Sequence, residues 1–335
     1  MPPRRPTQKD IAGLAGVSQA TVSMVLNDSE APAIPAETRQ RIVDAAKSLG
    51  YSPNRFAQAL KTRRTMTIAC IVPDITNPFY PSLIRGVQKA AQAQGYDVIA
   101  VNTDGLAEQE RHFVTWAGEG RVDGVIGVFF NTRAPDLAAL VDSDIPIVRI
   151  EASRKTGGDL AIDDLYVDSR AAARAVTEYL IGKGHRRIAM VAGIGGPQSE
   201  RIEGYREAVA EIGEMPLVHV EQNFDEKGGL RAAEKLLAKE PHFSAVFAAN
   251  DLMAIGVMQT LRERQIDIPG RVAVVGFDDI SAARLVTPSL TTVTQFQDRM
   301  GERAAAILVE RMQGKRSGPG TTEMMPFKLV ERDSA

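Results

Sequence analysis

The chain has a single cysteine, Cys70, among its 335 residues, and this excludes an intramolecular disulfide. Cys70 lies in the apolar run IACIV, so we expect a buried structural thiol rather than a nucleophile. No stretch approaches the roughly eighteen apolar residues of a membrane-spanning helix. The first ten residues, MPPRRPTQKD, have no apolar core, so no signal peptide is expected and the cytoplasm is the predicted location.

The sequence also lacks the common motifs of catalytic and cofactor sites. It has no G-x-x-x-x-G-K-[ST] phosphate loop and no G-x-S-x-G motif, and GIGGPQSERIEG has the wrong glycine spacing for dinucleotide binding. The acidic pairs at Asp163, near 250 and at Asp278 have no evident partner that would tune them as acid and base. The four histidines are His112, His185, His219 and His242, and their spacing does not match a metal site. We therefore predict no enzyme activity, no cofactor and no metal.

The net charge is only −2, but it is unevenly distributed. Residues 1–64 contain ten Lys/Arg and five Asp/Glu, a balance of +5, so the remainder carries −7. A basic head on an acidic body favours a polyanionic partner for the head alone. The alternative is a mildly basic N-terminal segment with no such partner.

Three short helices are expected in the first fifty residues. Thr7 can cap the first helix, with Asp10 near its positive end, and Gly16 permits a sharp turn. Ser18 can cap the second helix, and a third runs roughly from Pro35 to Leu49. Two short helices joined by a tight turn, with a third packed across them, are typical of a helix-turn-helix DNA-binding domain. A plain three-helix bundle that binds a protein is the alternative.

The second helix has an uncharged outer face. Its apolar residues, Val22, Val25 and Leu26, are expected to be buried. Hydrogen-bonding side chains without charge suit base edges, while the surrounding Lys and Arg supply affinity for phosphate. The exposed face is predicted to comprise Gln19, Ala20, Thr21, Ser23 and Met24. For Met24, burial in the domain's own core is the alternative.

Residues 53–64, between head and body, allow two interpretations. Pro53 can start a helix that continues to Lys61, but at about eight residues it is too short to be stable alone in water. The segment is either a disordered linker or a helix that forms on a support such as DNA phosphate.

From Met66 onward, strand-like apolar runs alternate with helical patterns for some 230 residues. This alternation predicts parallel sheets with crossover helices, in two doubly wound subdomains. Ligands of such folds bind at the carboxyl ends of strands, where polar residues occur here. These residues are Asp74, Asn77, Asn102, Asp104, Asn250, Asp251, Asp278 and Asp279.

Eight fragments together resemble the lactose-repressor/galactose-repressor family of bacterial transcription factors. They extend over nearly the whole chain in the family's order: TQKDIAGLAGVSQATVSMVLN, YSPNRFAQALKTRRT, VPDITNPFY, VDGVI, GHRRIAMVAG, RIEGY, ANDLMAIGVM and VVGFDD…PSLTTV. The resemblance implies a small all-α helix-turn-helix head, a hinge helix and an α/β core like that of periplasmic sugar-binding proteins. It also implies a homodimer on a palindromic operator, controlled by a small molecule that is usually a sugar.

The resemblance also implies roles for individual residues. Leu60 matches the hinge residue that wedges into the minor groove. The DNA-binding residues implied in this way, or by the helix pattern, are Thr7, Ser18, Gln19, Ala20, Thr21, Ser23, Met24, Asn27, Asn54, Ala57, Gln58 and Leu60. The effector-binding residues are Asp74, Phe79, Tyr80, Glu151, Arg201, Phe224, Asn250 and Asp278.

The chemistry of a sugar fits these residues, because aromatic rings cover its C–H faces and Asp, Asn and Arg bind its hydroxyls. Core packing of Phe79 and Tyr80, and a surface ion pair of Arg201 with Asp278, are the alternatives. Three features depart from the family. Met24 stands where many members of the family have an arginine. Arg149 and Glu151 suggest an unusual or charged ligand. The C-terminal residues show no heptad repeat, so a tetramer formed through a coiled coil is not indicated.

The expected domains are residues 1–52 for the head, 53–65 for hinge and linker, and 66–335 for the effector-binding core. Its subdomains are expected at about 66–165 with 294–322, and 166–293 with 323–335. Rival functions are a sugar-binding protein without a DNA role, which would have a signal peptide and no head, and a sugar-modifying enzyme, which would need a nucleophile or a nucleotide loop.

Overall fold

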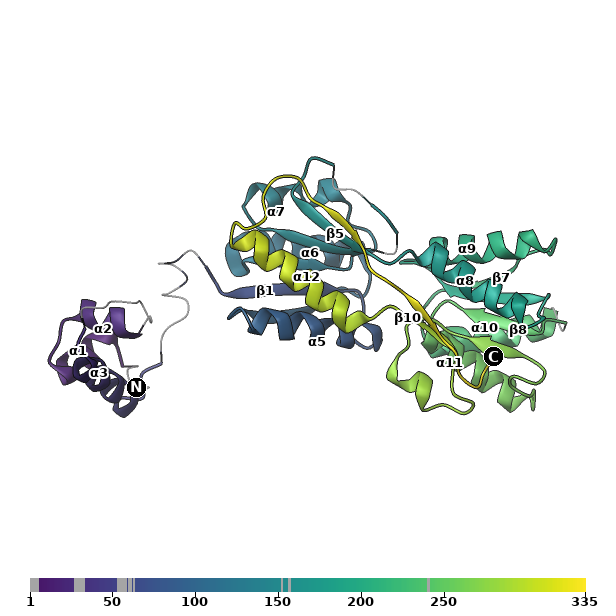
Figure 1. Ribbon diagram of the computed structural model, residues 1–335, viewed down its shortest axis with the longest axis horizontal. Coiled ribbons are helices and arrows are strands. Elements are labelled where there is room, and N and C mark those ends of the chain that lie inside the picture. The colour runs from purple at the N-terminus through teal and green to yellow at the C-terminus, as the bar shows by residue number, and fades with distance from the viewer. Residues whose placement is uncertain are drawn as a thin grey trace. The chain divides into compact units, whose positions relative to one another are not determined.

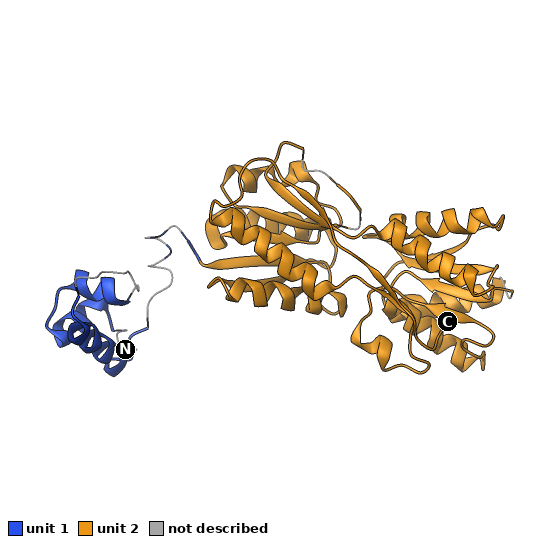
Figure 2. Ribbon diagram, viewed as in Figure 1, with its two compact units in different colours: residues 1–65 blue, residues 66–335 orange. Residues whose placement is uncertain are grey.

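The computed structural model describes residues 6–26, 34–52, 59, 62, 64–151, 153–155, 158–239 and 242–335. The chain divides into two compact units, residues 1–65 and 66–335 (Figure 2). The first is helical and the second is an α/β unit, which confirms the expected fold class. Within the described residues, no helix is long and apolar enough to cross a membrane.

The first unit contains α1 (Gln8–Ala15), α2 (Gln19–Leu26) and α3 (Ala36–Ser48). Thr7 and Asp10 form a reciprocal capping box at the start of α1, and Gly16 ends that helix with φ of 66°. Ser18 Oγ accepts a hydrogen bond from Thr21 N at 3.1 Å at the start of α2. One apolar cluster holds the three helices together: Ile11, Ala12, Ala15, Val22, Val25, Ile42, Ala45 and Ala46.

A six-stranded parallel sheet forms the first subdomain of the second unit (Figure 1). Its strand order is β11-β5-β4-β3-β1-β2. The strands are β1 (Thr67–Val72), β2 (Asp97–Asn102), β3 (Gly124–Gly127), β4 (Ile147–Glu151), β5 (Ile162–Tyr166) and β11 (Thr322–Met324). Cys70 is fully buried in β1, and this burial raises the pKa of its thiol to about 12, as suits a structural residue.

The second subdomain has a four-stranded parallel sheet of order β7-β6-β8-β9 and an antiparallel pair, β10-β12. The strands are β6 (Ile188–Gly193), β7 (Leu217–Glu221), β8 (Ala245–Ala248), β9 (Ala273–Val275), β10 (Thr292–Thr294) and β12 (Lys328–Val330). The chain passes between the subdomains after β5, after β10 and after β11.

Helices cover both faces of each sheet. On the first sheet α5 (Phe79–Gln92) and α12 (Gln297–Met312) cover one face, and α6 (Ala107–Trp116) and α7 (Ala138–Asp142) the other. The second sheet lies between the pair α8 (Ser169–Gly182) and α9 (Gln198–Glu211) and the pair α10 (Glu226–Lys239) and α11 (Asp251–Glu263). Short turns η1 (Ala117–Arg121), η2 (Ala134–Leu137) and η3 (Ser281–Arg284) complete the chain.

The apolar pattern did not predict α12, β5 or the short strands β10, β11 and β12. β5 contains two buried aspartates, which interrupt its apolar run. Asp164 accepts hydrogen bonds from Arg149 at 2.7 and 2.9 Å, and Asp163 accepts them from Arg311 at 2.6 and 3.2 Å. β11 pairs with β5 as far as Met324, so the boundary expected at 322 lies within a strand of the first sheet.

We expect Asp163→Ala to lower the free energy of unfolding by about 3–5 kcal/mol, because it leaves the buried Arg311 guanidinium without its partner. Burial raises the pKa of Asp163, but hydrogen bonds from Arg311 and Thr321 outweigh it, so the net shift is downward. The contribution is therefore complete above the ordinary value of 3.8 and is lost as pH falls through the lower folded pKa.

Urea unfolding at neutral pH and at about pH 3 measures this difference. Glu203→Ala is the matched control, since Glu203 pairs with Arg206 on the surface and should contribute about 0–1 kcal/mol. Equal effects of the two substitutions would contradict a stabilising role for the buried pair.

Candidate functional site

The outer face of α2 carries the predicted base-reading residues. Gln19, Ala20 and Met24 are exposed, and Thr21 and Ser23 are partly exposed. Met24 is 42 % exposed and is absent from the apolar cluster of this unit, so its burial in the core is wrong. Val22 and Val25 are buried on the opposite side, as expected, and Leu26 is half-buried.

Two predicted DNA contacts have roles within the unit itself. The Thr7 hydroxyl donates to Asp10 Oδ2 at 2.7 Å, and the Ser18 hydroxyl lies 2.8 Å from Thr21 Oγ1. Both side chains are partly or fully exposed and can also face phosphate. Asn27, Asn54, Ala57, Gln58 and Leu60 lie outside the described residues, so their roles stay predictions.

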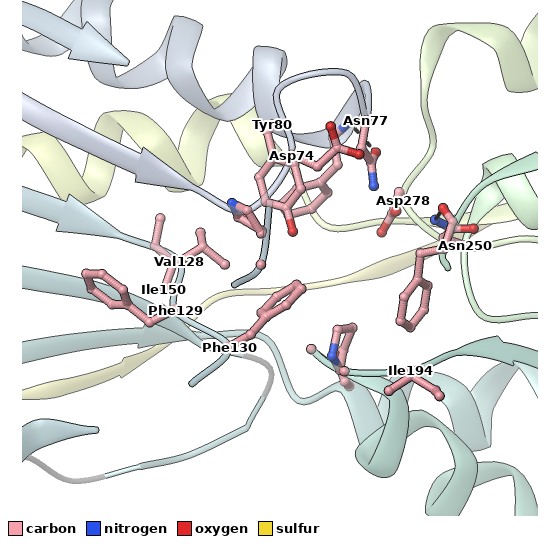
Figure 3. A pocket seen from close by; sticks show the side chains of 18 of the residues that line it. Asp74, Asn77, Tyr80, Val128, Phe129, Phe130, Ile150, Ile194, Asn250 and Asp278 are labelled. Carbon is pink, nitrogen blue, oxygen red and sulfur yellow. Dashed lines mark hydrogen bonds between the residues drawn. The ribbon is translucent and has the colours of Figure 1, made fainter. Parts of the chain in front are cut away.

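A cavity of about 520 Å³ lies in the second unit, between the two subdomains. Its walls come from the loops that follow β1, β2, β3 and β4 on one side and β6, β7, β8 and β9 on the other. Figure 3 shows Asp74, Asn77 and Tyr80 on one wall, with Asn250 and Asp278 across the space. Such a volume and position are typical of a small-molecule site in an open α/β fold.

All eight residues predicted to bind an effector line this cavity. They are Asp74, Phe79, Tyr80, Glu151, Arg201, Phe224, Asn250 and Asp278. Of the other polar residues at strand ends, Asn77 and Asp104 line it, whereas Asn102, Asp251 and Asp279 do not. Binding of an effector by these side chains stays a prediction.

Phe79 and Tyr80 form an aromatic wall at the start of α5. Their ring centroids are 5.1 Å apart at 81°, an edge-to-face contact. Tyr80 is buried within the core of the first subdomain, and Phe79 packs against that core. The packing role and the cavity role therefore coexist, because one part of each ring meets the core and another lines the cavity.

Arg201 and Asp278 are not a surface ion pair. They are 4 % and 5 % exposed, and Arg201 Nη2 lies 3.7 Å from Asp278 Oδ1. The guanidinium stacks 3.7 Å above the centroid of Phe277, and its Nη1 donates to the carbonyl of Ala249. Its Nε and the hydroxyl of Ser169 are buried and have no hydrogen-bond partner within the described part of the chain, although both residues line the cavity.

Asp278 and Asp251 are two buried carboxyls at the strand ends of the second subdomain. Burial raises the pKa of Asp278 to about 6, although Arg201 and the Gln295 amide, 2.7 Å away, both lower it. Burial also raises the pKa of Asp251 well above its ordinary value, and Asp278 raises it further. Asp251 is held by Ile280 N at 2.9 Å and Thr292 Oγ1 at 2.5 Å, so its role is structural.

The expectation of a charged ligand, drawn from Arg149 and Glu151, is only partly supported. Arg149 is absent from the cavity lining, since its guanidinium is committed to Asp164. Glu151 does line the cavity, but Lys155 pairs with it at 2.7 Å. Burial raises the pKa of Glu151, and Lys155 and Arg149 oppose that rise.

Several residues of the site were not predicted. Phe130, Asn131, Lys155, Ser169 and Gln295 also line the cavity. Lys155 follows the predicted strand β4, and the strand-end rule could have indicated it, whereas Ser169 follows β5, which the pattern did not predict. Phe130 is the last residue of VDGVIGVFF, where its apolar character made it look like part of the strand.

Comparison with known proteins agrees with this architecture. A model of the lacI family of bacterial regulatory proteins matches residues 7–54, and one described as a periplasmic binding protein-like domain matches residues 177–335. The chain is 36 % identical to the HTH-type transcriptional repressor PurR of Vibrio cholerae, over 98 % of this chain and 97 % of that one.

It is 35 % identical to the ribose operon repressor of Escherichia coli, over 98 % and 99 % of the two chains. Among solved structures, the transcriptional regulator CelR in complex with cellobiose aligns with a TM-score of 0.72. That alignment has 31 % identity and covers 99 % of this chain and all of the other.

We expect the stability of the Asp278→Asn variant relative to the parent to rise by about 2–3 kcal/mol between pH 4 and pH 7.5. The folded pKa of Asp278, about 6, lies above the ordinary value of 3.8, so the folded state holds a proton that the unfolded state releases. The parent therefore loses stability as pH rises through this window, whereas asparagine does not titrate.

Urea unfolding of both proteins across this pH range checks the difference. Glu203→Gln, a substitution in the exposed pair, is the control and should give a pH profile parallel to that of the parent. A parallel profile for Asp278→Asn would show that the carboxyl titrates normally.

Proposed function

This chain belongs to the lacI family of bacterial regulatory proteins, and we propose that it represses transcription under the control of a sugar-like effector bound in the interdomain cavity. The observation that carries the proposal is one chain with both a helix-turn-helix unit and a cavity of about 520 Å³ at the strand ends of two sheets. The role is regulatory rather than catalytic.

The DNA partner is a near-palindromic operator, bound by a homodimer in the cytoplasm. The uncharged face of α2 reads base edges, with Gln19, Ala20, Thr21 and Met24 nearest the groove. Basic residues of the first 64 contact phosphate, which makes affinity fall steeply with salt. Leu60 opens the central minor-groove step, where a leucine side chain offsets unstacking by bending the duplex.

The effector is a neutral or amino sugar rather than an anionic one. The two cations of the cavity wall are already paired, Lys155 with Glu151 and Arg201 with Asp278. Three further carboxylates line the wall, and within the described residues none has a cationic partner: Asp74, Asp104 and Asp225. These unpaired carboxylates would repel an anionic ligand. The hydroxyl and ammonium groups of a neutral or amino sugar can instead donate hydrogen bonds to them.

Arg201 is expected to bind an oxygen of the sugar, since its buried Nε has no hydrogen-bond partner among the described residues. We predict that Arg201→Lys weakens effector binding by about 10–100-fold, because lysine lacks the planar fork of the guanidinium. The operator affinity of the effector-free protein should stay within about threefold. Isothermal titration with neutral sugars, amino sugars and sugar phosphates, followed by operator binding with each, measures both quantities.

Arg206→Lys is the matched control for this test, since Arg206 lies on the same helix but is exposed and paired with Glu203. A sugar phosphate that binds in preference to its neutral parent would overturn the charge argument. Unchanged effector affinity in Arg201→Lys would exclude this side chain from the site.

Selection of operators from randomised DNA tests the first unit. Methionine cannot pair with guanine O6 and N7, but it packs on a thymine methyl group. We therefore expect the base pair nearest Met24 to be A·T or unspecified, and Met24→Arg to shift that one position toward G·C by about 1–3 kcal/mol. Identical preferences at every position would show that Met24 does not face the groove, and a pool without any selected operator would refute the proposed function.

A further inference from the structure

The loop that follows β3 is organised by a buried carboxylate outside the cavity lining. Glu110, in the first turn of α6, is fully buried. It accepts hydrogen bonds from the backbone N–H groups of Phe130 at 2.8 Å, Asn131 at 3.0 Å and Thr132 at 2.8 Å, and from the Thr132 hydroxyl at 2.8 Å. Across the part of the chain that is described, no cationic side chain pairs with it. Three successive N–H donors therefore satisfy this carboxylate.

The ring of Phe130 extends from this loop to the opposite subdomain. A Cβ atom added at Gly196 would lie 2.8 Å from Phe130 Cζ, and one at Gly195 would lie 3.7 Å from Phe130 Cδ2. On the near side, a Cβ at Gly105 would lie 3.2 Å from the same ring. The ring thus contacts glycine backbone on both sides of the cavity, and Figure 3 shows it between Tyr80 and Ile194.

The side chain of Phe130 is not part of a hydrophobic core of the described residues. Its neighbour Phe129 is 5 % exposed and belongs to the cluster between the first sheet and α6. Phe130 is half-buried, and it is not part of any apolar cluster formed by the described residues. The contacts of its ring lie at the cavity, so this side chain does not fix the loop by packing in the core under the sheet.

We propose that Glu110 and Phe130 are positioning residues that set how far the cavity closes. Glu110 holds residues 130–132 in one conformation, and Phe130 then rests on Gly195 and Gly196 and holds the two subdomains together. Gly196 is essential to this contact because a side chain there would occupy the place of the ring. The inference rests on the proposed function, since it describes the closure of the proposed effector site.

Distance measurement between two spin labels tests the proposal without knowledge of the effector. Labels are attached to the full-length chain at Glu119→Cys in the first subdomain and Met215→Cys in the second, which are 53 % and 76 % exposed. The native Cys70 is fully buried and does not compete for the label. Labelled chain is mixed with a large excess of unlabelled chain, so that a labelled oligomer contains one labelled copy and the measured distance lies within one chain.

Phe130→Ala is expected to raise the ratio of open to closed cavities by about tenfold, the order of one well-packed aromatic contact. Glu110→Gln should act in the same direction, because an amide places a donor against three backbone donors. Gly196→Ala should also open the cavity. Its matched control is Gly213→Ala, which has a similar positive φ, 73° against 52°, but no atom within 4 Å of the added Cβ.

The double variant Phe130→Ala with Gly196→Ala distinguishes loss of the contact between Phe130 and Gly196 from an unspecific effect of the substitutions on the structure. If the ring and Gly196 are in contact, the double variant opens no further than Phe130→Ala alone, since the ring that alanine displaces is already gone. Additive effects, or an unchanged distance distribution in Phe130→Ala, would overturn the proposal. Failure of the proposed function would be seen separately, as the absence of a selected operator.

Discussion

The triple passage of the chain between the two subdomains constrains everything at the cavity. The passages follow β5, β10 and β11, and they are neighbours: Met325 N donates to Tyr166 O, and Thr294 pairs with Lys328. Three neighbouring connections permit a hinge motion but oppose free rotation of one subdomain against the other. Gln295 and Phe327 lie on these connections, where Gln295 holds Asp278 and Phe327 packs against the cores of both subdomains. The cavity and its hinge therefore share residues.

This constraint brings buried charged and polar groups together at the cavity, and some of their hydrogen-bonding atoms stay without a partner among the described residues. Arg201 is stacked on Phe277 beside Asp278, yet among the described residues neither its Nε nor the Ser169 hydroxyl, which also belongs to the cavity lining, has a hydrogen-bond partner. Unpaired buried donors destabilise the protein, so their presence at a cavity wall is informative. This arrangement supports the proposal that a bound molecule completes the hydrogen bonds of the site. The same burial raises the pKa of Asp278 and lowers that of Arg201, which shows that both groups lie largely out of water.

Local pattern alone predicted most strands of the parallel sheets and several polar residues of the cavity lining. Alternating strands and helices indicated parallel sheets, and the strand-end rule then indicated Asp74, Asn77, Asn250 and Asp278. The pattern failed at β5, because buried Asp163 and Asp164 are paired with arginines that lie 148 and 15 residues away in the sequence. It also failed for Glu110, whose partners are 20 to 22 residues further along the chain. Charge burial of this kind depends on tertiary contacts that periodicity does not contain.

Arg149 illustrates how the same limit affects function. Its position at the end of β4 suggested a ligand contact, but its side chain turns to Asp164 and lies away from the cavity. Glu151 is two residues later in β4, and the period-two pattern of a strand places the side chains of such residues on the same face. Both do share one side, and Nη1 of Arg149 lies 3.8 Å from Glu151 Oε1. Arg149 thus holds Glu151 in place, while Lys155 neutralises its charge.

The charge of the cavity is consequently set elsewhere, by carboxylates on the loops after β1, β2 and β7. Recognition and closure then lie on different residues. Polar side chains at the strand ends face the cavity, whereas Glu110 and Phe130 act through the conformation of the loop after β3. A change of ligand preference requires new side chains at strand ends, and a change in the degree of closure requires only the loop. The two properties can therefore vary independently in one fold.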